Sequence, residues 1–147
     1  MRSAPIPLVK QAIQHSAAQQ VDIVFCSDML DLPCWLGMLT SELRNQKNLD
    51  DPILSCPIVM YFHENQWTYP KSPNAREDSH YGYTNLLSAL TADQCWFNSA
   101  FHIDEFMVAS ESFVSRMPDT RHEHALNSLA KNTAVVSPGL SKLPGAE

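Results

Sequence analysis

Glycine-rich loops, cysteine pairs and catalytic signatures are missing from this 147-residue chain, and each absence excludes a class of protein. With only four glycines, the chain has neither G-x-G-x-x-G nor G-x-x-x-x-G-K-[ST], the loops that bind nucleotide phosphates. Its four cysteines form no C-x-x-C pair and H-E-x-x-H is absent, which argues against zinc. No G-x-S-x-G elbow indicates a serine hydrolase. The common nucleotide, zinc and hydrolase motifs therefore give no account of this sequence.

Long apolar runs and basic clusters are missing too. No segment approaches the ~20 apolar residues of a membrane helix, and the N-terminus has no apolar core of a signal peptide. Sixteen acidic against ten basic residues give a net charge of −6, so the overall charge does not indicate nucleic acid binding. Because the cysteines lie mostly in or beside apolar runs, we predict buried, reduced thiols and a cytoplasmic protein without a membrane segment.

Short apolar runs rich in β-forming residues alternate with helical patterns along the chain. The predicted strands are 21–26, 57–62, 93–97 and 133–136, and the predicted helices are 6–20, 32–43, 81–92, 100–107 and 121–131. Residues 44–55 and 69–80 have the composition of loops. This alternation predicts an α/β domain with a mostly parallel sheet over residues 1–136, followed by a linker-like tail at 137–147.

Polar residues follow three of these predicted strands. Asp28 comes after the first, His63-Glu64-Asn65-Gln66 after the second, and Asn98-Ser99 after the third. In an open parallel sheet, ligands bind beyond the carboxyl ends of the strands, so these residues are candidates for a shared site. Each single position also has a structural alternative, because Asp28 and Ser99 are good helix N-caps and Asn98 could satisfy loop backbone groups.

The group that starts at His63 is the strongest candidate, since four consecutive polar residues exceed what ending a strand requires. An imidazole is suited to proton transfer, or to a hydrogen bond with a sugar hydroxyl, near neutral pH. Glu64 could hold that imidazole or point into the rim of the sheet. Nearby aromatic residues such as Tyr61 and Tyr69 offer flat surfaces for a sugar ring or a base. We predict no metal site, although the chain has six histidines, because His122 and His124 would face different ways on a helix.

Several of these stretches resemble one family. They are Tyr61-Phe62-His63-Glu64-Asn65-Gln66, Tyr69-Pro70, Tyr81-Gly82-Tyr83 and Phe97-Asn98-Ser99, and the likeness spans residues 2–139. They resemble the N-terminal domain of the tRNA-queuosine α-mannosyltransferases. The resemblance implies a Rossmann-like, three-layer domain that forms half of a retaining glycosyltransferase of the GT-B fold. It also implies GDP-mannose as the donor substrate, queuosine in tRNA as the acceptor, and no further cofactor.

The resemblance assigns roles to the candidate residues. It implies that His63 lies beside the transferred sugar as a catalytic residue, with Glu64. The substrate-binding residues that it implies are Asp28, Asn65, Gln66, Tyr69, Asn98 and Ser99. Compared with the family, the sequence lacks a first strand with a glycine-containing loop, and also a donor domain. We therefore expect an acceptor-side half that is inactive alone and needs a donor domain from elsewhere, or a homo-oligomer. The alternative is a noncatalytic, truncated α/β module for binding or oligomerisation.

Overall fold

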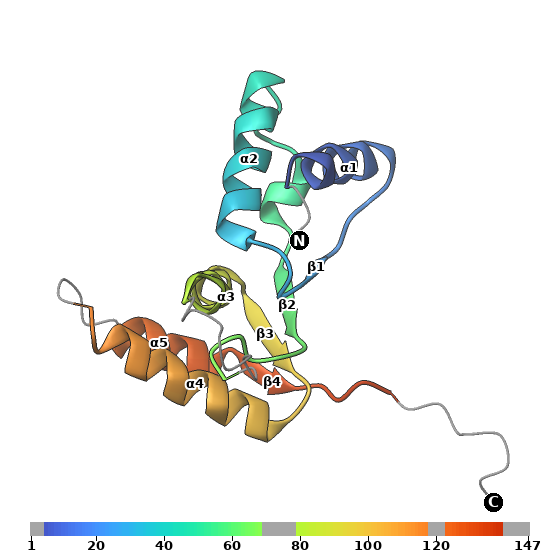
Figure 1. The fold of residues 1–147 in the computed structure, drawn as a ribbon. Helices are drawn as coiled ribbons and strands as arrows, with labels where there is room; N and C mark the ends of the chain where they lie inside the picture. Colours follow the sequence, from blue (N-terminus) through green and yellow to red (C-terminus); the bar gives the residue numbers. More distant parts are fainter. Residues whose placement is uncertain (1–4, 69–78, 118–122, 140–147) are drawn as a thin grey trace, which may run out of the picture.

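The alternating pattern folds into one parallel sheet with helices beside it (Figure 1). The computed structural model describes residues 5–68, 79–117 and 123–139. The strands are β1 (Val24–Ser27), β2 (Ile58–Phe62), β3 (Gln94–Phe97) and β4 (Thr133–Val135). They pair in the order β1-β2-β3-β4, and every pairing is parallel. The predicted α/β fold with a parallel sheet is confirmed.

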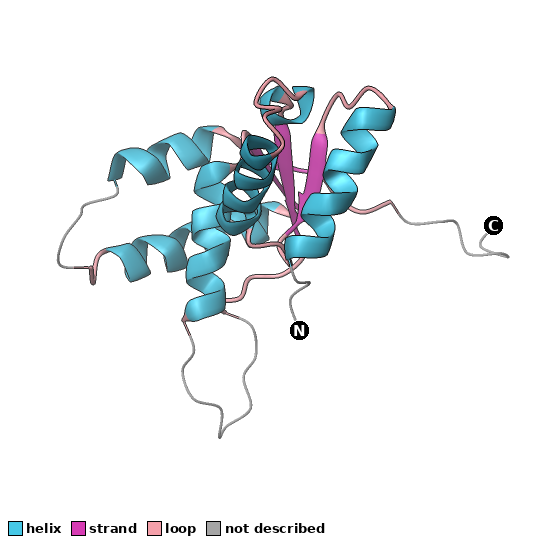
Figure 2. Ribbon diagram, turned by 90° about the horizontal axis from the view of Figure 1, so that it is seen from above, coloured by secondary structure: helices cyan, strands magenta, loops and turns pink. Residues whose placement is uncertain are grey.

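In the described residues, five α-helices connect and flank these strands (Figure 2). Their bounds are α1 (Pro5–Ala18), α2 (Leu32–Asn45), α3 (His80–Thr91), α4 (Ala100–Val114) and α5 (Glu123–Lys131). The helix α1 packs against α2, and α3 lies between α2 and α5. All five were predicted, although α4 continues further than the expected 100–107. The predicted loop at 44–55 needs a correction, because α2 runs on to Asn45 and a 3-10 helix, η1 (Pro52–Ser55), follows.

Local capping explains where two of the helices begin. The carboxylate of Asp31 accepts a hydrogen bond from the Cys34 backbone N–H at 3.1 Å, and Pro33 lies in the first turn of α2. The hydroxyl of Ser99 accepts from the His102 backbone N–H at 3.2 Å and starts α4. The predicted cap role of Ser99 is thus confirmed. Asp28 does not have the alternative role of a helix N-cap, because the N-cap of α2 is Asp31.

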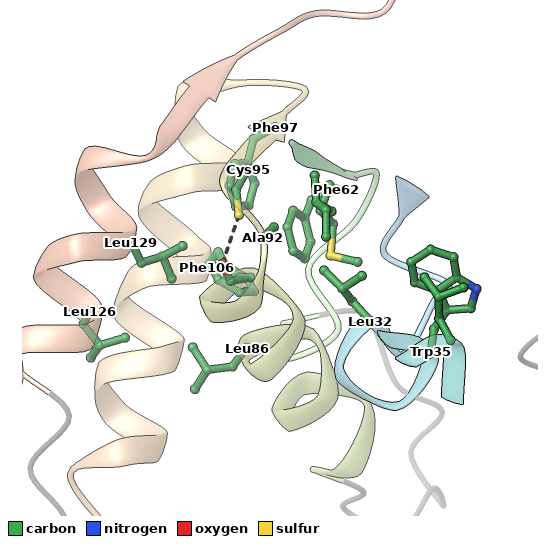
Figure 3. Packing of buried hydrophobic residues seen from close by; sticks show 14 of the residues in the cluster. Leu32, Trp35, Phe62, Leu86, Ala92, Cys95, Phe97, Phe106, Leu126 and Leu129 are labelled. Carbon is green, nitrogen blue, oxygen red and sulfur yellow. Dashed lines mark hydrogen bonds between the residues drawn. The ribbon is translucent and has the colours of Figure 1, made fainter. Parts of the chain in front are cut away.

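The core lies between the helices and one face of the sheet (Figure 3). The rings of Phe62 and Phe97 stack at 4.8 Å between centroids, and Phe106 of α4 contacts both at 5.2 and 5.4 Å. All three are at most 1% exposed. Burying a phenylalanine stabilises a fold by roughly 1.5–3 kcal/mol, so this triplet fixes α4 beneath the ends of β2 and β3.

The other face of the sheet has more exposed aromatic residues. Phe25 is 57% exposed, and its ring lies 6.4 Å from that of Tyr61 and 5.8 Å from that of Trp96. Both Tyr61 and Trp96 are half-buried. Because side chains alternate along a strand, these three residues share the face opposite to Phe62 and Phe97. This face therefore presents partly exposed aromatic surface.

The cysteines are less uniform than predicted. Cys95 is fully buried, Cys26 and Cys56 are half-buried, and Cys34 is exposed. Burial raises the pKa of the Cys95 thiol to about 12, and that of Cys26 to about 11. Both thiols are therefore protonated and unreactive at neutral pH. The prediction of buried thiols is wrong for Cys34, which lies on the outer side of the first turn of α2.

A close contact fixes α3 against the segment that follows β2. The indole of Trp67 lies directly over Gly82 of α3, where a Cβ atom would overlap the ring. The same indole packs against Phe113 of α4 at 4.5 Å between ring centroids. Glycine at position 82 therefore allows the helix and the Trp67 ring to approach each other.

Candidate functional site

The ends of β1, β2 and β3 lie together at one edge of the sheet, as the parallel pairing requires. The Asp28 backbone N–H donates to the carbonyl of Tyr61 at 3.0 Å. The side-chain amide of Asn98 donates to the carbonyl of His63 at 2.9 Å. Asp28, His63 and Asn98, each from a different strand end, thus lie on one rim, as the sequence predicts.

Asp28 holds His63 by two hydrogen bonds. Its Oδ1 lies 3.0 Å from Nδ1 of the imidazole, and its Oδ2 accepts from the His63 backbone N–H at 3.3 Å. Because a carboxylate only accepts, Nδ1 carries the proton and Nε2 is left as an acceptor. Asp28 is 4% exposed, whereas the side chain of His63 is 61% exposed. Because the imidazole lies mostly in solvent while the carboxylate is buried, this contact mainly orients the imidazole.

A second histidine, His102, lies on the other side of Asn98. The Asn98 amide is oriented by its bond to the His63 carbonyl, so its Oδ1 faces α4 and accepts from Ser99 Oγ at 3.1 Å. Nδ1 of His102 lies 3.2 Å from the same oxygen. His102 is 6% exposed and its ring meets that of Phe97 edge-on at 5.0 Å. A hydrogen-bonded chain therefore runs from Asp28 through His63 and Asn98 to His102.

Burial lowers the pKa of His102, because a charged imidazole is poorly solvated there. The carboxylates of Asp28 and Glu64 and the Glu64 backbone oppose this lowering, and the nearby His63 adds to it. His102 is consequently neutral at pH 7. His102 was not among the predicted site residues, since a single histidine in an apolar helical run looks like a core residue. The sequence feature that could have indicated His102 is its position three residues after the predicted cap Ser99.

The remaining residues of the predicted group have different roles. Glu64 accepts from the side-chain amide of Gln66 at 2.6 Å, so these two residues pair with each other and Asp28 holds the imidazole of His63 instead. Asn65 is 8% exposed, and its Oδ1 accepts from the Trp67 backbone N–H at 3.0 Å. Tyr69, another predicted binding residue, lies outside the described residues.

Several of the predicted site residues border a cavity of about 330 Å³, whereas Asp28 and Gln66 are not among its lining residues. Its walls come from the segment after β2, from the end of β3 and from the first turns of α4, and they include His63, Glu64, Asn65, Asn98, Ser99 and His102. The volume is at the lower end of the ~300–1,000 Å³ of small-molecule sites. Among the described residues, no lysine or arginine lines the cavity, whereas the carboxylates of Glu64 and Glu105 do. This lining disfavours phosphate and suits neutral hydroxyl groups.

Other kinds of site are not seen in the part of the chain that the structure describes. There, no three His, Cys, Asp or Glu side chains gather in a way that could hold a metal ion. Within the same ranges, none of the helices combines the length and the apolar character needed to cross a membrane.

Fold and site together define an α/β domain with a ligand cavity at the carboxyl ends of its parallel strands. Residues 1–140 match the family described as tRNA-queuosine alpha-mannosyltransferase N-terminal, and the chain belongs to this family. It is similar to the tRNA-queuosine alpha-mannosyltransferase of Drosophila melanogaster, with 30% identity over 114 residues. These cover 78% of this chain and 27% of the relative, so the chain spans about a quarter of the relative's length. No solved structure matches.

Proposed function

We propose that this domain forms the acceptor side of a retaining, GT-B-type glycosyltransferase that transfers mannose from GDP-mannose to queuosine in tRNA. The family and the Drosophila relative support the reaction class. The single observation that carries the proposal is the buried Asp28 beneath the exposed His63, at the edge where three strands end. In this proposal the chain does not transfer sugar alone, and GDP-mannose binds mainly to a donor domain outside it. A tRNA acceptor would place the enzyme in the cytoplasm.

In this function His63 orients a hydroxyl of the sugar or of the acceptor and exchanges a proton with it. Its Nε2 is the free acceptor of the imidazole, because Asp28 holds the proton on Nδ1. The Asp28 carboxylate also stabilises the imidazolium that forms when Nε2 takes up the proton. Asn98 and Ser99 form the adjoining wall of the cavity.

The charge of the domain restricts how tRNA could be bound. Its net charge of −6 repels the phosphate backbone, and the cavity lining includes two carboxylates. The cavity therefore receives the neutral diol of queuosine, while contacts to tRNA phosphates come from elsewhere in the enzyme.

The second candidate function is a noncatalytic binding or oligomerisation module. It is favoured by the partly exposed aromatic face with Phe25, Tyr61 and Trp96, of which Phe25 is the most exposed, and by the edge strand β1 that carries Phe25. In this alternative the aromatic face, and not the cavity, is the functional surface.

A thermal-shift experiment on the 147-residue chain separates the two candidates. We expect the nucleoside queuosine to raise the melting temperature, GDP to have no effect, and GDP-mannose to have a small effect. His63→Ala removes the response to queuosine, whereas His15→Ala, an exposed histidine on α1, keeps it. Stabilisation by none of the three ligands would favour the module. Stabilisation by GDP alone would place the donor site in this domain and contradict the acceptor-side assignment.

A further inference from the structure

Two buried polar groups of the cavity have no hydrogen-bond partner in the described residues. They are Nε2 of His102 and Nδ2 of Asn65, on side chains that are 6% and 8% exposed. An unpaired buried polar group costs about 1–3 kcal/mol, so such groups are rare in native proteins. Both side chains line the same cavity, and because the two atoms themselves have almost no solvent-accessible surface, a ligand there would pair with both only after a small movement of the side chains.

The hydrogen-bond chain determines what each of these groups can do. Asn98 donates to the His63 carbonyl, so the Asn98 Oδ1 must accept from His102, and the proton of His102 is on Nδ1. The neutral imidazole then has a bare acceptor at Nε2. The backbone of Glu64 lies near this ring and favours its protonated form, whereas Nε2 itself has no hydrogen-bond partner among the described residues. Asn65 uses its oxygen for the Trp67 backbone N–H and keeps an N–H free to donate.

One acceptor and one donor in a small cavity match a hydroxyl-bearing ligand, because a hydroxyl both donates and accepts. We infer that His102, as the Nδ1–H tautomer, accepts a hydrogen bond from a hydroxyl of a neutral polyol, and that Asn65 donates to the same polyol. This inference rests on the proposed function in placing a ligand in this cavity. It adds His102 and Asn65 as residues that select hydroxyl groups and reject charged ones.

The polyol has two possible sources, the transferred sugar and the acceptor diol, and both present hydroxyl groups. The test uses methyl α-D-mannopyranoside for the sugar, queuosine nucleoside for the acceptor, and GDP as a charged control. Ligand binding to the 147-residue chain is followed by long-range ¹H–¹⁵N NMR of its histidine side chains. The variants are His102→Phe, which keeps a ring but removes its nitrogens, and His15→Phe as the matched control on the exposed side of α1.

We expect the free protein to show the Nδ1–H tautomer of His102 at pH 7.5. One of the two polyols should shift the His102 Nε2 resonance in a saturable way, and GDP should not. His102→Phe should weaken binding of that polyol about tenfold, which corresponds to about 1.4 kcal/mol, a strong single hydrogen bond. His15→Phe should bind as the wild type does.

Three results would overturn the inference. They are an Nε2–H tautomer in the free wild type, no shift of His102 with either polyol, and equal affinity in His102→Phe. The wild-type measurements decide the matter even where His102→Phe does not fold. If methyl mannoside shifts His102 but queuosine does not bind, the inference is supported and the acceptor-side assignment fails. If queuosine binds in a His63-dependent manner and neither polyol shifts His102, the inference fails and the proposed function is supported.

Discussion

The two sides of the cavity hold a histidine in similar ways but give it different chemistry. On one side Nδ1 of His63 faces a buried carboxylate, and on the other Nδ1 of His102 faces the neutral amide oxygen of Asn98. His63 is exposed and His102 is buried. A carboxylate stabilises a positive imidazolium, whereas burial against an amide keeps the ring neutral. The difference shows how one fold separates a group suited to proton transfer from one suited only to hydrogen bonding.

Removing the imidazole on the carboxylate side should have the largest effect. In a full-length relative with a histidine aligned to His63, replacing that histidine by alanine should lower transfer to queuosine-tRNA by about 10²–10⁴-fold, the range of general acid–base groups. The measurement is steady-state transfer of radiolabelled mannose. Unchanged transfer would show that His63 has no role in proton transfer. His63 and His102 would then not differ in the way proposed.

Asp28→Asn should lower transfer less than loss of the His63 imidazole does, and it should affect only the His63 side of the cavity. Hydrogen bonds to charged groups are worth about 1.5–3 kcal/mol, so transfer in the full-length context should fall roughly ten- to a hundredfold. In NMR spectra of the 147-residue variant, His63 should lose its single tautomer while His102 keeps its own. A simultaneous change of both tautomers would show that the two sides are not independent.

Gly82→Ala tests the packing behind the Asn65 side of the cavity. A methyl group at this position overlaps the Trp67 indole, and Trp67 is linked to Asn65 through its backbone N–H. We expect a loss of about 1–3 kcal/mol in unfolding free energy, the usual range for overpacking, by urea denaturation. Gly37→Ala is the matched control in α2, because a Cβ at Gly37 meets no atom within 4 Å. Equal stability of the two variants would show that the indole moves aside freely.

The pH dependence of stability should show the smallest effect. Because the pKa of His102 is lowered in the folded protein, the unfolded chain binds a proton more readily as the pH falls below about 6.5. Stability is therefore fully present above that pH and decreases below it. Asp28, His63 and Glu64 also lie around the ring and act on its charge. The measured quantity is thus the difference between wild type and His102→Phe, and equal pH profiles would contradict a neutral, buried His102.

The sequence predicted the sheet and the rim of the site because both follow from local patterns. Apolar runs such as 58–62 define a buried parallel strand, and parallel strands bring their carboxyl ends to one edge. Asp28, His63 and Asn98 could therefore be placed together before any coordinates were known.

Partner choice among these side chains could not be predicted in the same way. Glu64, next to His63 in sequence, pairs with Gln66, while Asp28, 35 positions away, holds the imidazole. The burial of His102 depends on how α4 packs on Phe97, which residue type and spacing alone do not fix. The 3-10 helix at Pro52–Ser55 was missed because a single short turn has no periodicity to detect.

The position of β1 at the border of the sheet has a practical consequence for anyone who purifies this chain. A bordering strand presents unpaired backbone groups, and here Ile23 and Phe25 add exposed apolar surface to them. Concentrated samples will tend to aggregate through this strand. Replacing Phe25 by lysine should reduce this aggregation, because a charge on an edge strand disfavours its pairing with another chain. Phe25 does not line the cavity beside His63.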